Sequence, residues 1–196
     1  MRYQRRFIVI SVCLGTACLF ALGRESTSDA ADDGAMMAMM PTPVTKAVCV
    51  VHPLGDSKVG GKVTFTKTAG GIEVMAELTG LSPGEHGFHV HEYGDCSMMD
   101  GVCAGGHYNP TGMPHAGPDS PKRHEGDLGN ITADASGKAT LKLVDKMLRL
   151  NGPHSIVGRS IIVHAGRDDL TSQPSGDAGA RIGCGTIGIA DPKMEM

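Results

Sequence analysis

The alternation of apolar and polar residues along the chain is typical of short β-strands. The segments with this pattern, rich in Val, Ile, Thr and Phe, are residues 46–52, 61–68, 72–78, 130–134, 138–144, 160–163 and 185–189. Gly60-Gly61 and Gly70-Gly71 separate the first three segments and are turn signals. No segment has the sustained periodicity of a long helix. The pattern therefore predicts an all-β domain of about eight short antiparallel strands, folded as a sandwich or barrel.

The first 23 residues have the pattern of an export signal. Arg2, Arg5 and Arg6 precede an apolar run over residues 7–22. That run is short for a membrane span, and it ends in a small-residue cleavage site, Ala-Leu-Gly at residues 21–23. We therefore expect export to the periplasm or outside the cell, with an uncleaved anchor as the alternative.

Two weaker signals bear on the same segment. Arg5-Arg6 is similar to a twin-arginine signal, and Cys18 is a candidate for a lipid anchor. We expect contact with a membrane only if the signal segment or such an anchor is retained.

Residues 24–43 are acidic, small and Met-rich, with four methionines over residues 36–40. Such a segment cannot bury enough apolar surface to fold, which predicts a flexible linker. A sharper alternative is that its thioether sulfurs hold cuprous ion for delivery, since soft ligands select that ion. The folded domain is expected over residues 44–191, with a short tail at 192–196.

Composition narrows the function classes. With 18 basic and 21 acidic residues, the chain has no basic excess that would indicate a nucleic-acid partner. It has nine histidines but no tryptophan and only four phenylalanines. Six of those histidines fall between residues 86 and 127, which points to a metal site.

The spacing of the histidines suggests two sites. In a strand, His89 and His91 point to one face and His86 to the other, so the first two form half of a site for copper or zinc. His164, which ends an apolar run, is the best remaining candidate to complete it.

A second set of ligands follows in a stretch rich in Gly, Pro and Ser. Its members are His107, His115, His124 and Asp127. Three imidazoles and one carboxylate on a loop suit a closed, four-coordinate zinc site.

These motifs resemble those of the copper/zinc superoxide dismutases over roughly residues 44–191. The matching segments are Gly-Phe-His-Val-His-Glu-Tyr-Gly-Asp at 87–95, Ala-Gly-Gly-His-Tyr-Asn-Pro at 104–110, Gly-Asp-Leu-Gly-Asn at 126–130, Gly-Arg-Ser-Ile-Ile-Val-His at 158–164 and Gly-Ala-Arg-Ile-Gly-Cys-Gly at 179–185. The resemblance implies a Greek-key β-barrel whose two long loops, roughly 92–128 and 165–182, carry the function. It also implies disproportionation of superoxide to oxygen and hydrogen peroxide, with one copper and one zinc per subunit.

The resemblance also implies a role for each site residue. The copper ligands are His89, His91, His107 and His164. The zinc ligands are His107, His115, His124 and Asp127, so His107 bridges the metals and transfers a proton. Arg181 attracts the superoxide anion, Asp168 links a copper histidine to a zinc histidine, and His86 is not a ligand.

Four cysteines remain after the signal segment. The resemblance implies one disulfide from the metal-binding loop to Cys184, and Cys96 is favoured over Cys103 as its partner. Cys49 lies within an apolar strand and is expected to be a buried free thiol. A disulfide fits an exported protein.

Subunit contacts and rival functions complete the expectations. Residues 155–158 and 188–190 resemble segments used for subunit contact by dimeric members, which favours a homodimer; the alternative is that they are only barrel-edge residues. A copper-delivery protein on the same fold is the main rival function. However, the chain has no Cys-x-x-Cys pair, and all seven presumed ligands are present. A purely structural barrel would need neither Arg181 nor the full ligand set.

Overall fold

The computed structural model describes residues 42–194. The signal segment and most of the Met-rich segment expected from the sequence lie outside the described residues. The strands are β1 (Lys46–Pro53), β2 (Gly60–Thr68), β3 (Gly71–Thr79), β4 (Gly84–His91), β5 (Asp127–Ala133), β6 (Ala139–Asp145), β7 (Ser160–His164) and β8 (Arg181–Ile189). One short 3₁₀ helix, η1 (Val102–Ala104), interrupts the loop after β4.

The eight strands form a closed antiparallel barrel in the order β1-β2-β3-β6-β5-β4-β7-β8. Hairpins join β1 to β2 and β2 to β3, whereas β3 pairs with β6 and β4 pairs with β7 across longer connections. This is a Greek-key arrangement, and β8 closes the barrel against β1. The all-β, eight-stranded barrel expected from the sequence is confirmed.

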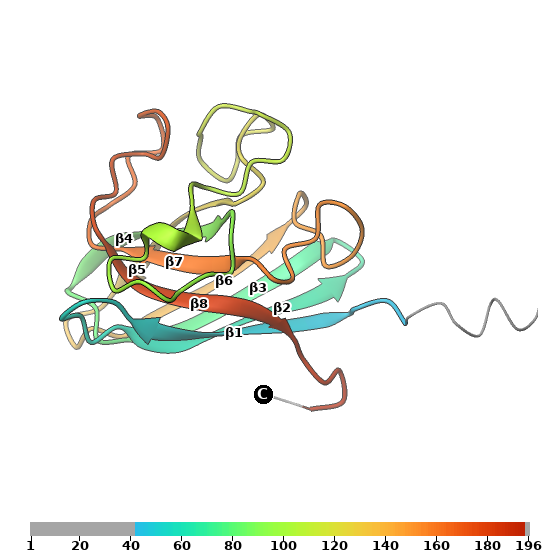
Figure 1. Cartoon of the computed structure of the whole chain (residues 1–196), viewed down its shortest axis with the longest axis horizontal. Coiled ribbons are helices and arrows are strands. Elements are labelled where there is room, and N and C mark those ends of the chain that lie inside the picture. The colour runs from blue at the N-terminus through green and yellow to red at the C-terminus, as the bar shows by residue number, and fades with distance from the viewer. Residues whose placement is uncertain (1–41, 195–196) are drawn as a thin grey trace, which may run out of the picture. The chain divides into compact units, whose positions relative to one another are not determined.

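Strand β4 explains how the barrel carries a site on its outer face. Phe88 and Val90 point into the core and are fully buried. His89 and His91 alternate with them and so lie on the outside of the barrel wall. They are nevertheless buried, because the two long loops cover this face (Figure 1).

The strand ends differ from the sequence expectation in two places that matter for the site. β5 begins at Asp127 rather than at Asn130, because Asp127 continues the pairing with β4 opposite His89. β8 begins at Arg181, which pairs with His164 at the end of β7. Asp127 and Arg181 therefore lie at strand ends in the barrel wall and not in the long loops.

Within residues 42–194, no helix is long and apolar enough to cross a membrane.

Candidate metal centre

Four buried imidazoles gather on the outer side of β4. His89 and His91 come from β4, His164 ends β7, and His107 pairs with His91 through an isolated β-bridge. One nitrogen from each ring lies within 4.8 Å of the others. The structure thus brings together the four residues predicted for copper.

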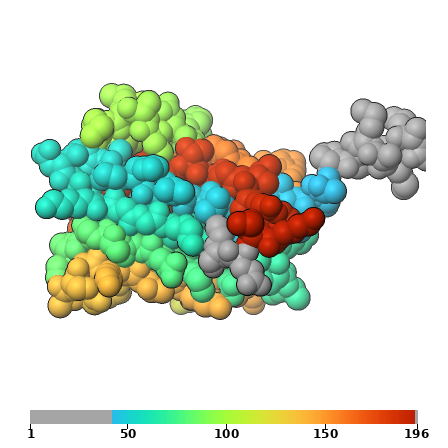
Figure 2. All heavy atoms as spheres, turned by 90° about the horizontal axis from the view of Figure 1, so that it is seen from below, coloured from blue at the N-terminus to red at the C-terminus, as the bar shows by residue number. Residues whose placement is uncertain are grey.

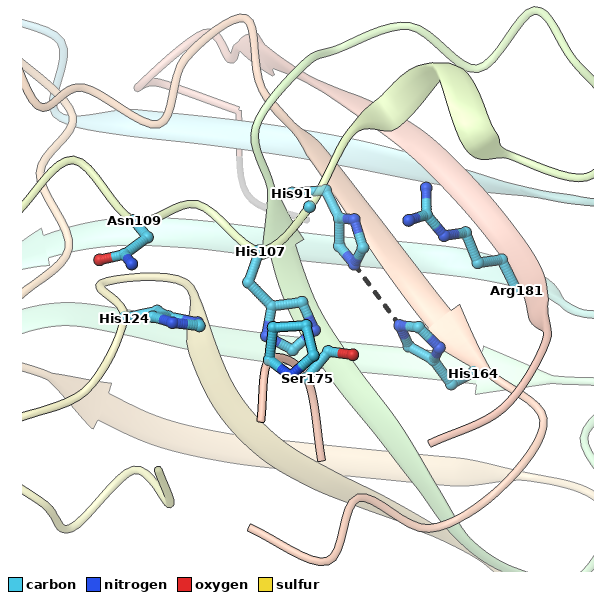
Figure 3. A pocket seen from close by; sticks show the side chains of 9 residues that line it. His91, His107, Asn109, His124, His164, Ser175 and Arg181 are labelled. Atoms are coloured by element: carbon cyan, nitrogen blue, oxygen red, sulfur yellow. Dashed lines mark hydrogen bonds between the residues drawn. The ribbon is translucent and has the colours of Figure 1, made fainter. Parts of the chain in front are cut away.

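Backbone and side-chain acceptors orient three of these rings. His91 Nδ1 donates to Gly105 O at 3.0 Å and His164 Nδ1 donates to Gly179 O at 3.0 Å. The opposite nitrogens, both Nε2, then face each other at 3.4 Å, as Figure 3 shows. His89 directs its Nε2 to the buried Asp168 carboxylate and leaves its Nδ1 on the side of the other rings.

Burial keeps His89, His91 and His164 neutral. It lowers the pKa of His89 to about 3 and of His164 to about 4, and it lowers the pKa of His91 well below its ordinary value. Neutral imidazoles are the form that binds a metal, because the lone pair is then free.

The second group surrounds the carboxylate of Asp127. Its Oδ1 lies 2.8 Å from His107 Nδ1 and 3.1 Å from both His115 Nδ1 and His124 Nδ1. Its Oδ2 accepts the backbone N–H groups of Ala116 at 3.1 Å and His124 at 3.0 Å. Burial by itself would raise the pKa of Asp127, but the hydrogen bonds from His107 and His115 outweigh it and hold that pKa well below the usual range. The carboxylate is therefore charged and fixed in place.

His107 belongs to both groups through opposite edges of its ring. Its Nδ1 faces Asp127, and its Nε2 faces the other histidines. Among the described residues, five buried side-chain atoms have no hydrogen-bond partner, and His107 Nε2 and His89 Nδ1 are the two that belong to the four-imidazole group. Buried polar atoms are rarely left unpaired, so each of these two is best explained as a metal ligand. The donor sets fit as well, since imidazole suits copper, and three imidazoles with one carboxylate suit zinc.

Asp168 joins the two groups behind the metal positions. Its Oδ2 accepts from His89 Nε2 at 2.7 Å and its Oδ1 accepts from His115 Nε2 at 3.0 Å, with the carboxylate fully buried. Asn130 holds its backbone by two hydrogen bonds of 2.8 and 2.9 Å. Burial by itself would lower the pKa of His115, but the hydrogen bonds to Asp127 and Asp168 raise it to about 9.

A cavity of about 350 Å³ opens beside His91, His107 and His164. Arg181 lines it and is held by two backbone carbonyls, with Nη1 donating to Gly101 O and Nη2 to Gly105 O, both at 2.6 Å. In Figure 3 the guanidinium stands on the same side as the His91–His164 pair. A fixed cation therefore borders the space where a small anion would approach.

One disulfide fastens the first long loop to the barrel. It joins Cys96 to Cys184 across a sequence separation of 88 residues. Cys103 is a free, partly buried thiol. Cys49 is a buried free thiol, as expected, and burial raises its pKa to about 12.

His86 is close to the site but outside both groups. It is buried, with Nδ1 donating to His164 O at 2.8 Å and Nε2 lying 2.9 Å from Ser82 O. It therefore supports the backbone of a candidate ligand.

Four groups that support the site carry no signal in the sequence. These are the Gly101 and Gly105 carbonyls that hold Arg181, the Asn130 carboxamide under Asp168, and the Gln173 carboxamide on the backbone of His115. Backbone carbonyls leave no trace in residue type. An Asn or Gln in a loop has no spacing signal that points to a partner far away in sequence.

Comparisons with known proteins agree with this geometry. Residues 59–187 match the family described as copper/zinc superoxide dismutase. A superoxide dismutase [Cu-Zn] of Paramecium bursaria Chlorella virus 1 is 46% identical over 157 residues, covering 75% of this chain and 81% of that protein. The chain belongs to the copper/zinc superoxide dismutase family.

A solved structure also matches. The crystal structure of the clock protein EA4 superposes with a TM-score of 0.70 at 39% identity, covering 77% of this chain and 98% of that chain.

The family and its named relative identify the reaction. The chain is an oxidoreductase that disproportionates superoxide to oxygen and hydrogen peroxide, with one copper and one zinc per subunit. The copper-delivery alternative is not favoured, because both ligand groups are complete in the structure.

Proposed function

We propose that the two ligand groups divide between the metals as follows. Copper is held by His89, His91, His107 and His164. Zinc is held by His107, His115, His124 and Asp127. The observation that carries this assignment is that His107 presents opposite ring nitrogens to the two groups. His91, His107 and His164 of the four-imidazole group line the cavity with Arg181, whereas His124 is the only member exclusive to the second group that does so, and this suits copper as the metal that must meet substrate.

Arg181 captures the substrate. A guanidinium stays charged at working pH and can hydrogen-bond a small anion while attracting it from a distance. Because the Gly101 and Gly105 carbonyls fix its Nη atoms, the charge is held beside the cavity before superoxide arrives. The residues between Asp169 and Asp177 carry no charge, so attraction rests mainly on Arg181.

His107 accepts and donates one of the two protons that the reaction consumes. When bound, copper supplies the one-electron exchange with superoxide, and zinc supplies a fixed positive charge beside His107 Nδ1. His107 Nε2 takes up a proton in the half-reaction that releases oxygen. It gives that proton up in the half-reaction that forms hydrogen peroxide, and water provides the second one.

Asp168 orients both groups at once. Its two hydrogen bonds keep His89 Nδ1 and His115 Nδ1 directed toward the metal positions. Partners of this kind fix the tautomer and direction of a ligand imidazole.

The test is superoxide dismutation by the purified protein with copper and zinc measured on the same sample. Activity should follow copper content and fall sharply in His164→Ala and Arg181→Ile. A fully loaded protein without activity would favour copper delivery and contradict the proposal.

Export is proposed on two supports: the basic and apolar pattern of residues 1–23 and the Cys96–Cys184 disulfide, which persists in oxidising compartments. We expect the full chain to appear in the periplasmic or extracellular fraction. A form lacking residues 2–23 should stay in the cytoplasm, and equal export of both forms would refute the signal.

A homodimer is proposed through the outer face of β1 and β8. Val50 on β1 and Ile189 at the end of β8 expose 53% and 67% of their surface. Figure 2 shows the light blue residues of β1 beside the red residues at the end of β8. Sedimentation should give a dimer for the wild type and a monomer for Ile189→Glu; a monomeric wild type would refute the proposal.

The Met-rich segment at residues 35–40 is proposed to help load copper from a donor, since thioethers favour cuprous ion. Its deletion should slow copper loading, and unchanged loading would leave a plain tether.

A further inference from the structure

The side chain of Gln173 pairs with the backbone of His115 at two points. Its Oε1 accepts the His115 N–H at 2.8 Å, and its Nε2 donates to His115 O at 2.8 Å. The two residues are 58 positions apart, on the two different long loops. This pairing fixes both the position and the orientation of the His115 peptide, as a neighbouring strand would.

The segment around Gln173 also covers the buried pair of Asp168 and His115. Gly176 closes a turn by donating its N–H to Ser172 O at 2.7 Å. A Cβ placed on Gly176 would lie 1.7 Å from Asp168 Oδ1 and 2.7 Å from His115 Nε2. The Gly176 backbone therefore lies directly against the hydrogen bond that orients the His115 ring. Gln173 and Gly176 constrain one residue from two sides.

The same segment forms part of the cavity wall. Pro174 and Ser175, which follow Gln173, line the cavity together with His107 and Arg181 (Figure 3). Gln173 thus connects the backbone of a candidate zinc ligand to the wall of the substrate space.

We propose that Gln173 is a positioning residue for zinc, acting through His115. The proposal rests on the assignment of His115 as a zinc ligand under Proposed function. Without the carboxamide, the His115 peptide loses both hydrogen bonds to the second loop, and the imidazole can move away from the direction that zinc requires. Partners behind a ligand commonly change metal affinity by about 10–100-fold when removed.

The chain contains a matched control for this experiment. The Asn151 carboxamide makes the same two-point pair with the backbone of Val44, at 2.8 Å for both bonds. Val44 lies two residues before β1 and belongs to neither ligand group. Gln173 and Asn151 are both exposed, so near-isosteric apolar substitutions are compatible with folding.

The experiment compares Gln173→Met and Asn151→Leu with the wild type as copper- and zinc-loaded enzymes. Zinc release to an excess of chelator is followed over time, and the visible spectrum is recorded with cobalt in place of zinc. We expect Gln173→Met to release zinc about 10-fold faster and to alter the cobalt spectrum, while Asn151→Leu matches the wild type in both. Wild-type behaviour of Gln173→Met, or equally fast release from Asn151→Leu, would overturn the proposal.

A third variant separates this proposal from the ligand assignment. His115→Ala should lose most zinc binding. If it does while Gln173→Met behaves as wild type, the positioning role alone fails. If His115→Ala holds zinc as well as the wild type, the ligand assignment and the positioning role both fail.

Discussion

Replacing Gly176 by alanine is the most demanding test of the packing behind the metal centre. Gly176 has a φ of +72°, in the left-handed region that favours glycine. Its added methyl group would meet Asp168 Oδ1 at 1.7 Å and Asp168 Cγ at 2.5 Å. Neither atom can move away easily, because the Asp168 carboxylate is buried and hydrogen-bonded to His89 and His115.

The expected loss has two parts. A left-handed conformation costs an alanine about 1–2 kcal/mol relative to glycine. Moving the Asp168 carboxylate breaks at least one charge-assisted hydrogen bond, which contributes about 1.5–3 kcal/mol. We therefore expect the free energy of unfolding of the metal-free protein to fall by about 2.5–5 kcal/mol.

Urea unfolding of the metal-free protein measures this loss, and chelator competition measures zinc affinity, which should weaken about 10–100-fold. Gly152→Ala is the control, because Gly152 has a φ of +83° and nothing within 4 Å of an added Cβ. It should lose only the backbone part, about 1–2 kcal/mol, and bind zinc normally. Equal losses in the two variants, or unchanged zinc affinity in Gly176→Ala, would refute the reasoning.

Three further outcomes are expected. The wild-type dismutation rate should fall as salt is added and Arg181→Ile should remove most of that dependence in stopped-flow assays, whereas a rate that rises with salt contradicts steering by this cation. Cys184→Ser should lower the free energy of unfolding by about 2–5 kcal/mol in denaturant titrations, and an unchanged midpoint would deny the disulfide a stabilising role. The metal-free protein should be most stable near pH 6.5. Below that pH, His89 and His164 take up protons in the unfolded chain but stay neutral in the folded protein, where their pKa values are about 3 and 4, so acid favours unfolding. Above it, the folded protein loses the stabilising proton on His115 as the pH rises through its folded pKa of about 9. A stability that keeps rising from pH 6.5 to 9 would contradict the last of these.

The barrel could be predicted from the sequence because its strands are local patterns. In β4, the alternation of Phe88 and Val90 with His89 and His91 determines which side chains enter the core. Side chains alternate along a strand whatever its neighbours are, so this information is carried by the segment itself. The ends of β5 and β8 were wrong because pairing with β4 and β7, and not residue type, extends them to Asp127 and Arg181.

The sequence by itself determined which residue types are available for metals: the histidine spacing, Asp127, and the arginine ahead of Cys184. Only the tertiary structure decided which ring nitrogens converge, that Asp168 joins His89 to His115, and that Gln173 holds His115 from the other loop. The reason is physical. Metal coordination and hydrogen bonding depend on directions between atoms tens of residues apart, and those directions exist only once the barrel has closed and brought its loops together.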